Sequence, residues 1–404
     1  MPTEIVQLRG LEGPNLYMPQ PGVFLQVRST TQRARRLKDA LKDGAQSIGM
    51  VLGHLEVDTF VDEHGNVTNV NFTTPTPPIG VALAQYVVEG LNRQEAGDEE
   101  WDAEGPLWDL QKRRRAEALP LPALQLIAEA ASRGIPSQVR PDGQIQLGYG
   151  VRSWAFDPGQ FAKRTTASFG DDDIGIGSPP FARAQAALDV PWEQLGPIPV
   201  LGIAGGAARD IAAQILAAEL EALGRPTSVA LAADYNATRT LLASPSATIA
   251  VVGLTAVGIA ERGLALERCA YSAITDLPTE LPAGIADRAE LARVLGVPML
   301  ITDASGGVAL NADVPEIVAL AEYAPCPLSY FSTGDDNPII GFHRAEGGRA
   351  LFVREGVVFA AQGAGEQAVV AATLPPAEMP GALAALALLW AMGLTWEQIR
   401  GAAA

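Results

Sequence analysis

The residues whose types and spacing suit chemistry lie in a glycine-rich turn between an apolar segment and a long helix-forming segment. The stretch reads Val200-Leu201-Gly202-Ile203-Ala204-Gly205-Gly206-Ala207-Ala208-Arg209-Asp210-Ile211. Glycines in such a turn can expose backbone N–H groups to the phosphates of a nucleotide. A Walker-type loop also needs a Lys for the β- and γ-phosphates and a Ser or Thr hydroxyl for Mg²⁺. This stretch has the glycines but neither the Lys nor the hydroxyl.

The candidate nucleotide loop consists of Gly202, Gly205, Gly206, Ala208, Arg209 and Asp210. Arg209 can replace the Lys as a positive charge. Asp210 stands where the hydroxyl is needed, and its carboxylate would repel a triphosphate at close range. We therefore predict a remnant of a nucleotide loop, and we expect no catalytic residue, no metal ligand and no bound cofactor.

Length and composition predict a cytoplasmic globular protein of two domains. A chain of 404 residues is too long for one ordinary core, and 48% hydrophobic residues are typical of a folded protein. The net charge of −17 argues against nucleic acid and anionic membranes as partners. Cys269 and Cys326 lack metal-ligand spacing and are expected to be buried, reduced thiols. The sequence has no signal-peptide pattern and no apolar run of about 18 residues.

Residues 1–155 predict an α+β domain. Strands are predicted at 5–9, 23–28, 48–61, 67–73, 135–140 and 144–149, and helices at 31–42, 76–92 and 121–133. The helix over 31–42 is basic, which is typical of a solvated face and leaves a polyanion site as the alternative. His64 is predicted in the turn of a hairpin, and residues 95–115 at the surface.

Residues 156–195 have the composition of a linker, including the acidic triplet Asp171-Asp172-Asp173. Such a triplet can bind a metal, but solvation is favoured in a glycine-rich linker. From residue 196 to 404, strands alternate with helices, which predicts a parallel sheet covered on both faces. Strands are predicted at 200–203, 228–232, 248–252, 272–275, 298–303 and 328–331, and helices at 209–223, 285–294, 315–323, 381–392 and 396–403. Short strands at 339–343, 350–353, 357–361 and 368–372 are predicted to form a small antiparallel appendage.

Several short motifs, taken together and in order, resemble cyanophycin synthetase, whose last part is a Mur-ligase-type module that forms amide bonds with ATP. They are Leu8-Arg9-Gly10, Gly13-Pro14-Asn15, Arg133-Gly134-Ile135-Pro136, Gln146-Leu147-Gly148-Tyr149-Gly150, Ile259-Ala260-Glu261-Arg262-Gly263-Leu264, Leu310-Asn311-Ala312-Asp313 and Tyr330-Phe331-Ser332. The resemblance covers about 1–155 and 196–404. It implies an N-terminal α+β domain followed by an α/β domain similar to Mur ligases and P-loop NTPases. An ATP-grasp domain does not fit into the 40 residues between them, and the Mur C-terminal domain is expected to be missing.

The resemblance also places the catalytic positions of the family on unsuitable residues. The Mur loop falls on Ile203 to Arg209, and the acidic metal ligand falls on or next to Gly253. The Asp-His pair of the family is replaced by Leu277-Pro278-Thr279-Glu280, and its adenine-binding helix reads Met379-Pro380-Gly381-Ala382-Leu383. No Lys occurs from 164 to 404, so a phosphate-binding or carbamylated Lys is impossible there.

The N-terminal domain of many cyanophycin synthetases resembles a peptidase with a His-x-x-Glu-His helix, in which the i, i+4 spacing directs the ligands to one Zn²⁺. The match places Val81, Ala84 and Gln85 at the ligand and base positions. None of these side chains can do that chemistry, so zinc hydrolysis is not expected.

The combined interpretation is a catalytically degenerate homologue of cyanophycin synthetase, a pseudoenzyme with an assembly or regulatory role in Asp/Arg peptide metabolism. An ATP-dependent amino-acid ligase that holds ATP and Mg²⁺ through Arg209 and the N–H groups of the loop is the alternative, and a sensor of a small molecule or peptide is a third. We expect a homodimer, or a subunit in an assembly with a cyanophycin synthetase-like protein. Trp390 and Trp396, near the helix over 381–392, are candidates for the interface; packing within the core is their other interpretation.

Overall fold

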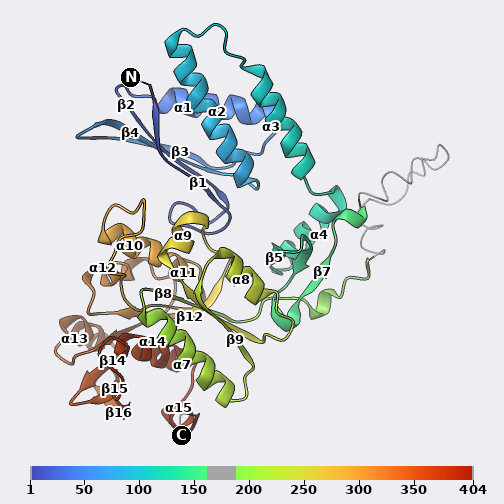
Figure 1. The fold of residues 1–404 in the computed structure, drawn as a ribbon. Helices are drawn as coiled ribbons and strands as arrows, with labels where there is room; N and C mark the ends of the chain where they lie inside the picture. Colours follow the sequence, from blue (N-terminus) through green and yellow to red (C-terminus); the bar gives the residue numbers. More distant parts are fainter. Residues whose placement is uncertain (1, 162–187, 403–404) are drawn as a thin grey trace. The chain divides into compact units, whose positions relative to one another are not determined.

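The computed structural model describes residues 2–161 and 188–402, and the chain divides into two compact units (Figure 1). Unit 1 comprises Met1–Ala118 with Gly258–Ala265, and unit 2 comprises Leu119–Val257 with Leu266–Ala404. The division falls at Leu119, whereas the sequence placed a domain boundary near residue 155. The acidic triplet of the predicted linker lies outside the described residues.

Unit 1 is a four-stranded antiparallel sheet with helices on one face (Figure 1). The strand order is β1-β2-β4-β3. The strands are β1 (Glu4–Leu11), β2 (Gly22–Ser29), β3 (Leu55–Asp62) and β4 (Gly65–Thr73), and the helices are α1 (Ala34–Ile48), α2 (Pro77–Ala96) and α3 (Glu104–Glu117). Alternate residues of β2, such as Val23 and Leu25, join Leu37 and Leu41 of α1 and Leu83 of α2 in one apolar cluster. The apolar faces of the strand and of the two helices thus pack against the same core.

Two parts of unit 1 differ from the prediction. The strand predicted from residue 48 begins only at Leu55, because α1 continues to Ile48 and ends at Gly49. Gly49 is left-handed (φ 66°), and its N–H bonds the last carbonyls of the helix. Helix α3 was not predicted, because all of its residues are half-buried or exposed and so give no apolar stripe.

Residues 119–161 form a small layer of unit 2. Helix α4 (Leu121–Ser132) packs on a three-stranded antiparallel sheet of β5 (Ser137–Val139), β6 (Ile145–Leu147) and β7 (Trp154–Phe156). The side-chain amide Nε2 of Gln146 donates to the carbonyl of Leu242 at 3.0 Å, and the N–H of Val151 donates to the carbonyl of Ala247 at 2.9 Å. These bonds join the layer to the rest of unit 2, and they explain why the two units divide before it.

The main part of unit 2 is a nine-stranded sheet of order β16-β15-β14-β13-β12-β11-β8-β10-β9. Its strands are β8 (Val200–Ala204), β9 (Thr227–Ala233), β10 (Ile249–Leu254), β11 (Cys269–Ile274), β12 (Thr302–Asn311), β13 (Leu328–Ser332), β14 (Arg349–Arg354), β15 (Val357–Gln362) and β16 (Gly365–Ala371). The strands from β9 to β14 in this order run parallel, whereas β14, β15 and β16 pair antiparallel. The predicted α/β class with a parallel sheet is confirmed. The expected antiparallel appendage is a continuation of the same sheet.

Helices cover both faces of this sheet. Helices α7 (Ala208–Ala222) and α14 (Met379–Ala391) pack side by side on one face. The right-handedness of crossovers places α8 (Tyr235–Leu242), α11 (Val297–Leu300) and α13 (Pro338–Ala345) on the other. The remaining helices are α9 (Ala256–Arg262), α10 (Arg288–Leu295), α12 (Pro315–Val318) and α15 (Trp396–Ala402). In the part of the chain that the structure describes, no helix is both long and apolar enough to cross a membrane.

Two segments predicted as strands are helical, and each helix has a proline in its first turn. The first part of the segment predicted at 298–303 lies in α11, and only its last two residues lie in β12, which begins at Thr302. The segment over 339–343 lies in α13, where the side-chain oxygen of Asn337 accepts from the N–H of Ile339 at 2.9 Å. Proline is well suited to the first helical turn, and an Asn cap reinforces the start, so these signals outweighed the strand preference of the Ile and Val residues.

The two tryptophans expected at an interface lie within unit 2. Their ring centroids are 5.3 Å apart, and Trp396 is 8% exposed. The guanidinium of Arg349 stacks over the ring of Trp390 at 4.9 Å from its centroid. Helix α14 is buried along most of its length, so most of its apolar surface packs in the core of unit 2.

Candidate functional site

The loop between β8 and α7 has the strand–turn–helix form that the sequence predicted. Strand β8 ends at Ala204 and α7 begins at Ala208. From β8 the chain continues to β9 on one side, and from the adjacent β10 it continues to β11 on the other. The loop therefore lies at a topological switch point, at the carboxyl ends of the parallel strands, where open α/β sheets bind ligands.

Arg209, predicted as a substitute for the phosphate-binding Lys, is directed back into the protein. Its Nε and Nη2 donate to the two carboxylate oxygens of Asp210 at 2.9 and 3.0 Å, and its Nη1 donates to the carbonyl of Gly205 at 3.0 Å. The residue is only 9% exposed. All three nitrogens of the guanidinium are thus paired within the loop.

Asp210, which the sequence analysis placed where a hydroxyl for Mg²⁺ would be needed, is held by two further features. Its Oδ1 accepts from the N–H of Ala232 at 2.9 Å. Ala232 lies in a bulge of β9 and has a φ of 44°, which is rare for a residue other than glycine. A Cβ at Gly253, the position of the family's metal ligand, would lie 2.9 Å from that same oxygen. Glycine at 253 therefore makes room for the Arg209–Asp210 pair.

The pKa of the Asp210 carboxyl is lowered. Burial raises it, but the hydrogen bonds from Arg209 and Ala232 and the charge of Arg209 together outweigh burial. Asp210 is therefore an ionised partner of Arg209 at neutral pH.

A second carboxylate occupies the N–H group of the glycine turn. Oδ1 of Asp276 accepts from the N–H of Gly206 at 2.8 Å and from the hydroxyl of Thr275 at 2.7 Å. A Cβ at Gly206 would approach Oδ2 of Asp276 to 2.4 Å, so glycine is needed for this contact. An anion of the chain thus sits where a glycine turn would hold a phosphate. Sequence reasoning missed Asp276, although its place directly after β11, the neighbour of β8, was a signal.

The hydrogen bonds continue along the carboxyl edge of the sheet. The amide of Asn311 donates to the carbonyl of Thr275 at 2.7 Å. The Asp313 carboxylate accepts from the hydroxyl of Ser332 at 2.6 Å and from the amide of Asn337 at 3.0 Å. Two of the motifs that carried the resemblance, Leu310–Asp313 and Tyr330–Ser332, therefore meet at this edge through polar contacts between strand ends.

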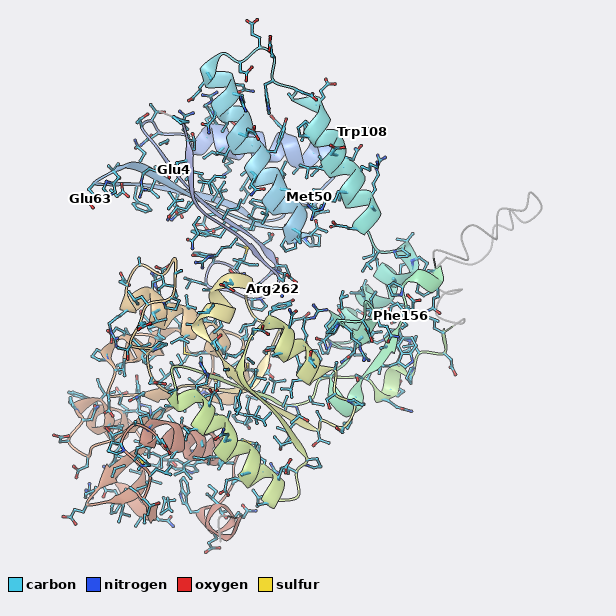
Figure 2. All side chains as sticks on the ribbon, in the orientation of Figure 1. Glu4, Met50, Glu63, Trp108, Phe156 and Arg262 are labelled. Carbon is cyan, nitrogen blue, oxygen red and sulfur yellow. The ribbon has the colours of Figure 1, made fainter. Side chains whose placement is uncertain are left out.

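Two other motifs of the resemblance meet in unit 1, although about 250 residues separate them. The N–H of Leu264 donates to the carbonyl of Pro14 at 2.8 Å, and the N–H of Glu12 donates to the carbonyl of Arg262 at 2.7 Å. The guanidinium of Arg262, which Figure 2 labels, also pairs with the carboxylate of Glu12 at 2.5 Å. A Cβ at Gly13 would lie 1.9 Å from the carbonyl oxygen of Leu264. We call these residues the 12–264 clamp. Its contacts are structural ones.

The positions matched to a zinc helix lie on α2. Ala84 is fully buried in the apolar core of unit 1, and Gln85 is exposed. Across residues 2–161 and 188–402, no three His, Cys, Asp or Glu side chains come together as a possible metal site. Cys269 is buried and Cys326 half-buried, and both are free thiols.

Comparison with known proteins places the chain in a family. The family model described as "Domain of unknown function (DUF4938)" matches residues 2–329, and the chain belongs to this family. Cyanophycin synthetase of Synechocystis sp. is 33% identical over 170 residues, which are 40% of this chain and 20% of that protein. Cyanophycin synthetase of Trichormus variabilis is 24% identical over 245 residues, 54% of this chain and 27% of that protein. The predicted similarity to cyanophycin synthetase is confirmed, and the chain spans only a minor part of these relatives.

Among solved structures, MurF from Acinetobacter baumannii has a TM-score of 0.40 and 15% identity, over 51% of this chain and 45% of that one. UDP-N-acetylmuramoyl-L-alanyl-D-glutamate–2,6-diaminopimelate ligase has a TM-score of 0.41 and 13% identity, over 54% of this chain and 47% of that one.

Proposed function

We propose that this protein is a catalytically degenerate homologue of cyanophycin synthetase with an assembly or regulatory role in cyanophycin-type (Asp/Arg) peptide metabolism. The observation that carries the proposal is the internal pairing of the loop. The guanidinium of Arg209 is paired with Asp210 and Gly205, and the N–H of Gly206 with Asp276. A triphosphate would have to displace both carboxylates while meeting their negative charge.

The pattern of retained and replaced residues also supports the proposal. The motifs similar to cyanophycin synthetase form the 12–264 clamp and the polar contacts at the carboxyl edge of the sheet, which are structural features. The positions of the phosphate-binding Lys, the hydroxyl for Mg²⁺ and the acidic metal ligand hold other residues. This pattern is expected when selection maintains the fold but no longer maintains the catalytic residues.

The test is binding of Mg-ATP, measured by calorimetry and by the shift in unfolding temperature. A ligand at 100 times its Kd stabilises the folded state by about 2.7 kcal/mol, which for a domain of this size is a shift of about 5–10 °C. We expect no shift with millimolar Mg-ATP, and none on chelation with EDTA. Micromolar affinity for ATP, or ATP consumption with Asp and Arg or their peptides, would reject the proposal.

A second candidate is an ATP-dependent amino-acid ligase with a re-purposed loop. It is favoured by the retained strand–turn–helix form and by Ala207, which is exposed at the start of the 15-residue helix α7, where N–H groups attract anions. The variant Ala208→Lys/Arg209→Thr separates the candidates. On the first proposal it still binds ATP weakly, because Asp276 remains on Gly206; on the second, the added Lys and Thr increase the affinity for Mg-ATP at least tenfold.

A further inference from the structure

Strand β9 ends the nine-stranded sheet, and the described residues place no strand on its outer side. Its seven residues, Thr227–Ala233, include no charged side chain. Val229 and Leu231 are 41% and 40% exposed, and residues two apart on a strand share a face. An apolar edge strand offers unpaired backbone N–H and C=O groups to a further strand.

The opposite edge of the sheet is built differently. Strand β16 carries Glu366, which pairs with Arg344 at 2.7 Å and with Arg354 at 2.9 Å. Charged side chains on an edge oppose pairing with another chain. On β9 the only such device is the bulge at Ala232, and residues 227–230 keep a regular register with β10. Charged side chains thus protect the β16 edge against pairing with another chain, whereas the β9 edge has no such side chains.

We propose that β9 pairs antiparallel with β9 of a second copy of this chain, about a twofold axis at Ala230. The main sheet then continues from one copy into the other. In this register Val229 of each copy lies opposite Leu231 of the other, with side chains on one face and Cβ atoms about 4.5–5.5 Å apart. The two exposed apolar side chains of each strand are thereby buried against each other.

Neighbouring registers bury less apolar surface. A shift of the axis to Val229 pairs the two Val229 residues but sets both Leu231 residues against Thr227. A shift to Leu231 pairs the two Leu231 residues but sets both Val229 residues against Ala233. Each of these registers has one pair of large apolar side chains, whereas the axis at Ala230 has two. Cross-strand pairs of large apolar side chains stabilise a sheet more than pairs with small or polar ones. The axis at Ala230 is therefore the preferred one.

Charge also favours a second copy as the occupant. Arg225 precedes β9 and Asp234 follows it, both are exposed, and Arg225 makes no ion pair within the described part of the chain. In the proposed pairing Arg225 of each copy lies near the end of the partner strand that Asp234 follows, just beyond the bulge at Ala232, so opposite charges meet at both ends of the paired strands. Two copies of a protein of net charge −17 repel each other at most surfaces. The edge at β9 has no charge in its centre and has opposite charges at its two ends.

The inference gives the proposed assembly role a surface, and it does not depend on whether the loop binds nucleotide. Light scattering of the full chain at micromolar concentration is expected to give twice the mass of 42.3 kDa. Val229→Lys/Leu231→Lys places like charges at the centre of the interface and is expected to give a monomer. The matched control is Val370→Lys on β16, a residue that is likewise 40% exposed, and it should leave the dimer intact. A dimer that survives the β9 variant would overturn the proposal, as would a monomeric wild-type protein.

Single cysteines test the register. The two Ala230 residues lie opposite each other, within the range in which a disulfide can form. The two Ser228 residues are separated by four residues along the strands, about 14 Å. Ala230→Cys should cross-link under mild oxidation and Ser228→Cys should not, with the unmodified chain as background for Cys269 and Cys326. Equal cross-linking of the two variants, or a dimer without cross-linking at Ala230, would reject this interface. ATP binding would reject the proposed function and leave the interface standing.

Discussion

Replacing Asp210 by Ala tests whether the remnant loop is a structural element. The change removes the acceptor of two hydrogen bonds from Arg209, at 2.9 and 3.0 Å, and of one from Ala232, at 2.9 Å. The buried guanidinium keeps only the carbonyl of Gly205. Removing one partner of a buried ion pair costs about 3–5 kcal/mol. Because the Asp210 side chain is 27% exposed, water can replace part of the loss, so the lower end, about 3 kcal/mol, applies.

That loss corresponds to a decrease of about 6–12 °C in the unfolding temperature of unit 2, measured by circular dichroism. Asp335→Ala is the control, because Asp335 pairs with Arg354 at 2.7 Å but both side chains are well exposed. Exposed pairs contribute less than about 1 kcal/mol. If the two variants unfold at the same temperature, the account of the Arg209–Asp210 pair is wrong.

The same variant has a defined pH dependence. The folded-state pKa of Asp210 lies below its ordinary value of 3.8, so its stabilisation is complete above the unfolded-state pKa and is lost as pH falls through the folded-state pKa. The difference between wild type and Asp210→Ala should be constant from pH 5 to 7 and shrink below about pH 4. A difference that grows on acidification would contradict the ionised pair.

Three further changes test other parts of the molecule. Burial raises the pKa of Glu219, so the wild type loses stability as pH rises through that pKa; Glu219→Gln should unfold at a higher temperature at pH 7 and at the same one at pH 4. Burial raises the pKa of Cys269 to about 12 and of Cys326 to about 11, so a thiol reagent at pH 7.5 should react slowly with the half-buried Cys326 and with Cys269 only after unfolding; fast labelling of Cys269 in the folded protein would show that it is accessible. Gly13→Ala should lower the stability of unit 1 by about 2 kcal/mol or more because its Cβ meets the clamp, whereas Gly341→Ala, in open space on a helix, should raise stability by up to about 1 kcal/mol; equal unfolding midpoints would refute the clamp.

The sequence predicted most of the sheet of unit 2 because its strands are short apolar runs separated by helices of regular period. It failed where a proline began a helix inside such a run, at Pro298 and Pro338, since the local preference of Ile and Val favours a strand. It also failed at α3, which lacks a buried stripe. At the two prolines, one local signal outweighed another; at α3, no local signal marks a helix without a buried face.

At the candidate site, the sequence singled out Arg209 and Asp210 but not the residues that they contact. Their pairing, the contact of Asp276 with Gly206 and the N–H of Ala232 depend on strand order and on a bulge, which no local pattern reports. Without these contacts the buried polar groups of the loop would be unpaired, at a cost of about 1–3 kcal/mol each.

The internal partners also connect the remnant loop with the edge of the sheet. The Asp210 carboxylate accepts from the N–H of Ala232, whose left-handed conformation forms the bulge that ends the regular part of β9. Asp210 thus fixes the length of the edge strand available for regular pairing. Without Asp210, the N–H of Ala232 has no acceptor and the strained φ loses its compensation. Asp210→Ala should therefore weaken dimerisation as well as lower the unfolding temperature, whereas Asp335→Ala should change neither. A dimer of unchanged affinity in Asp210→Ala would separate the loop from the edge and leave the pair with a role in stability alone.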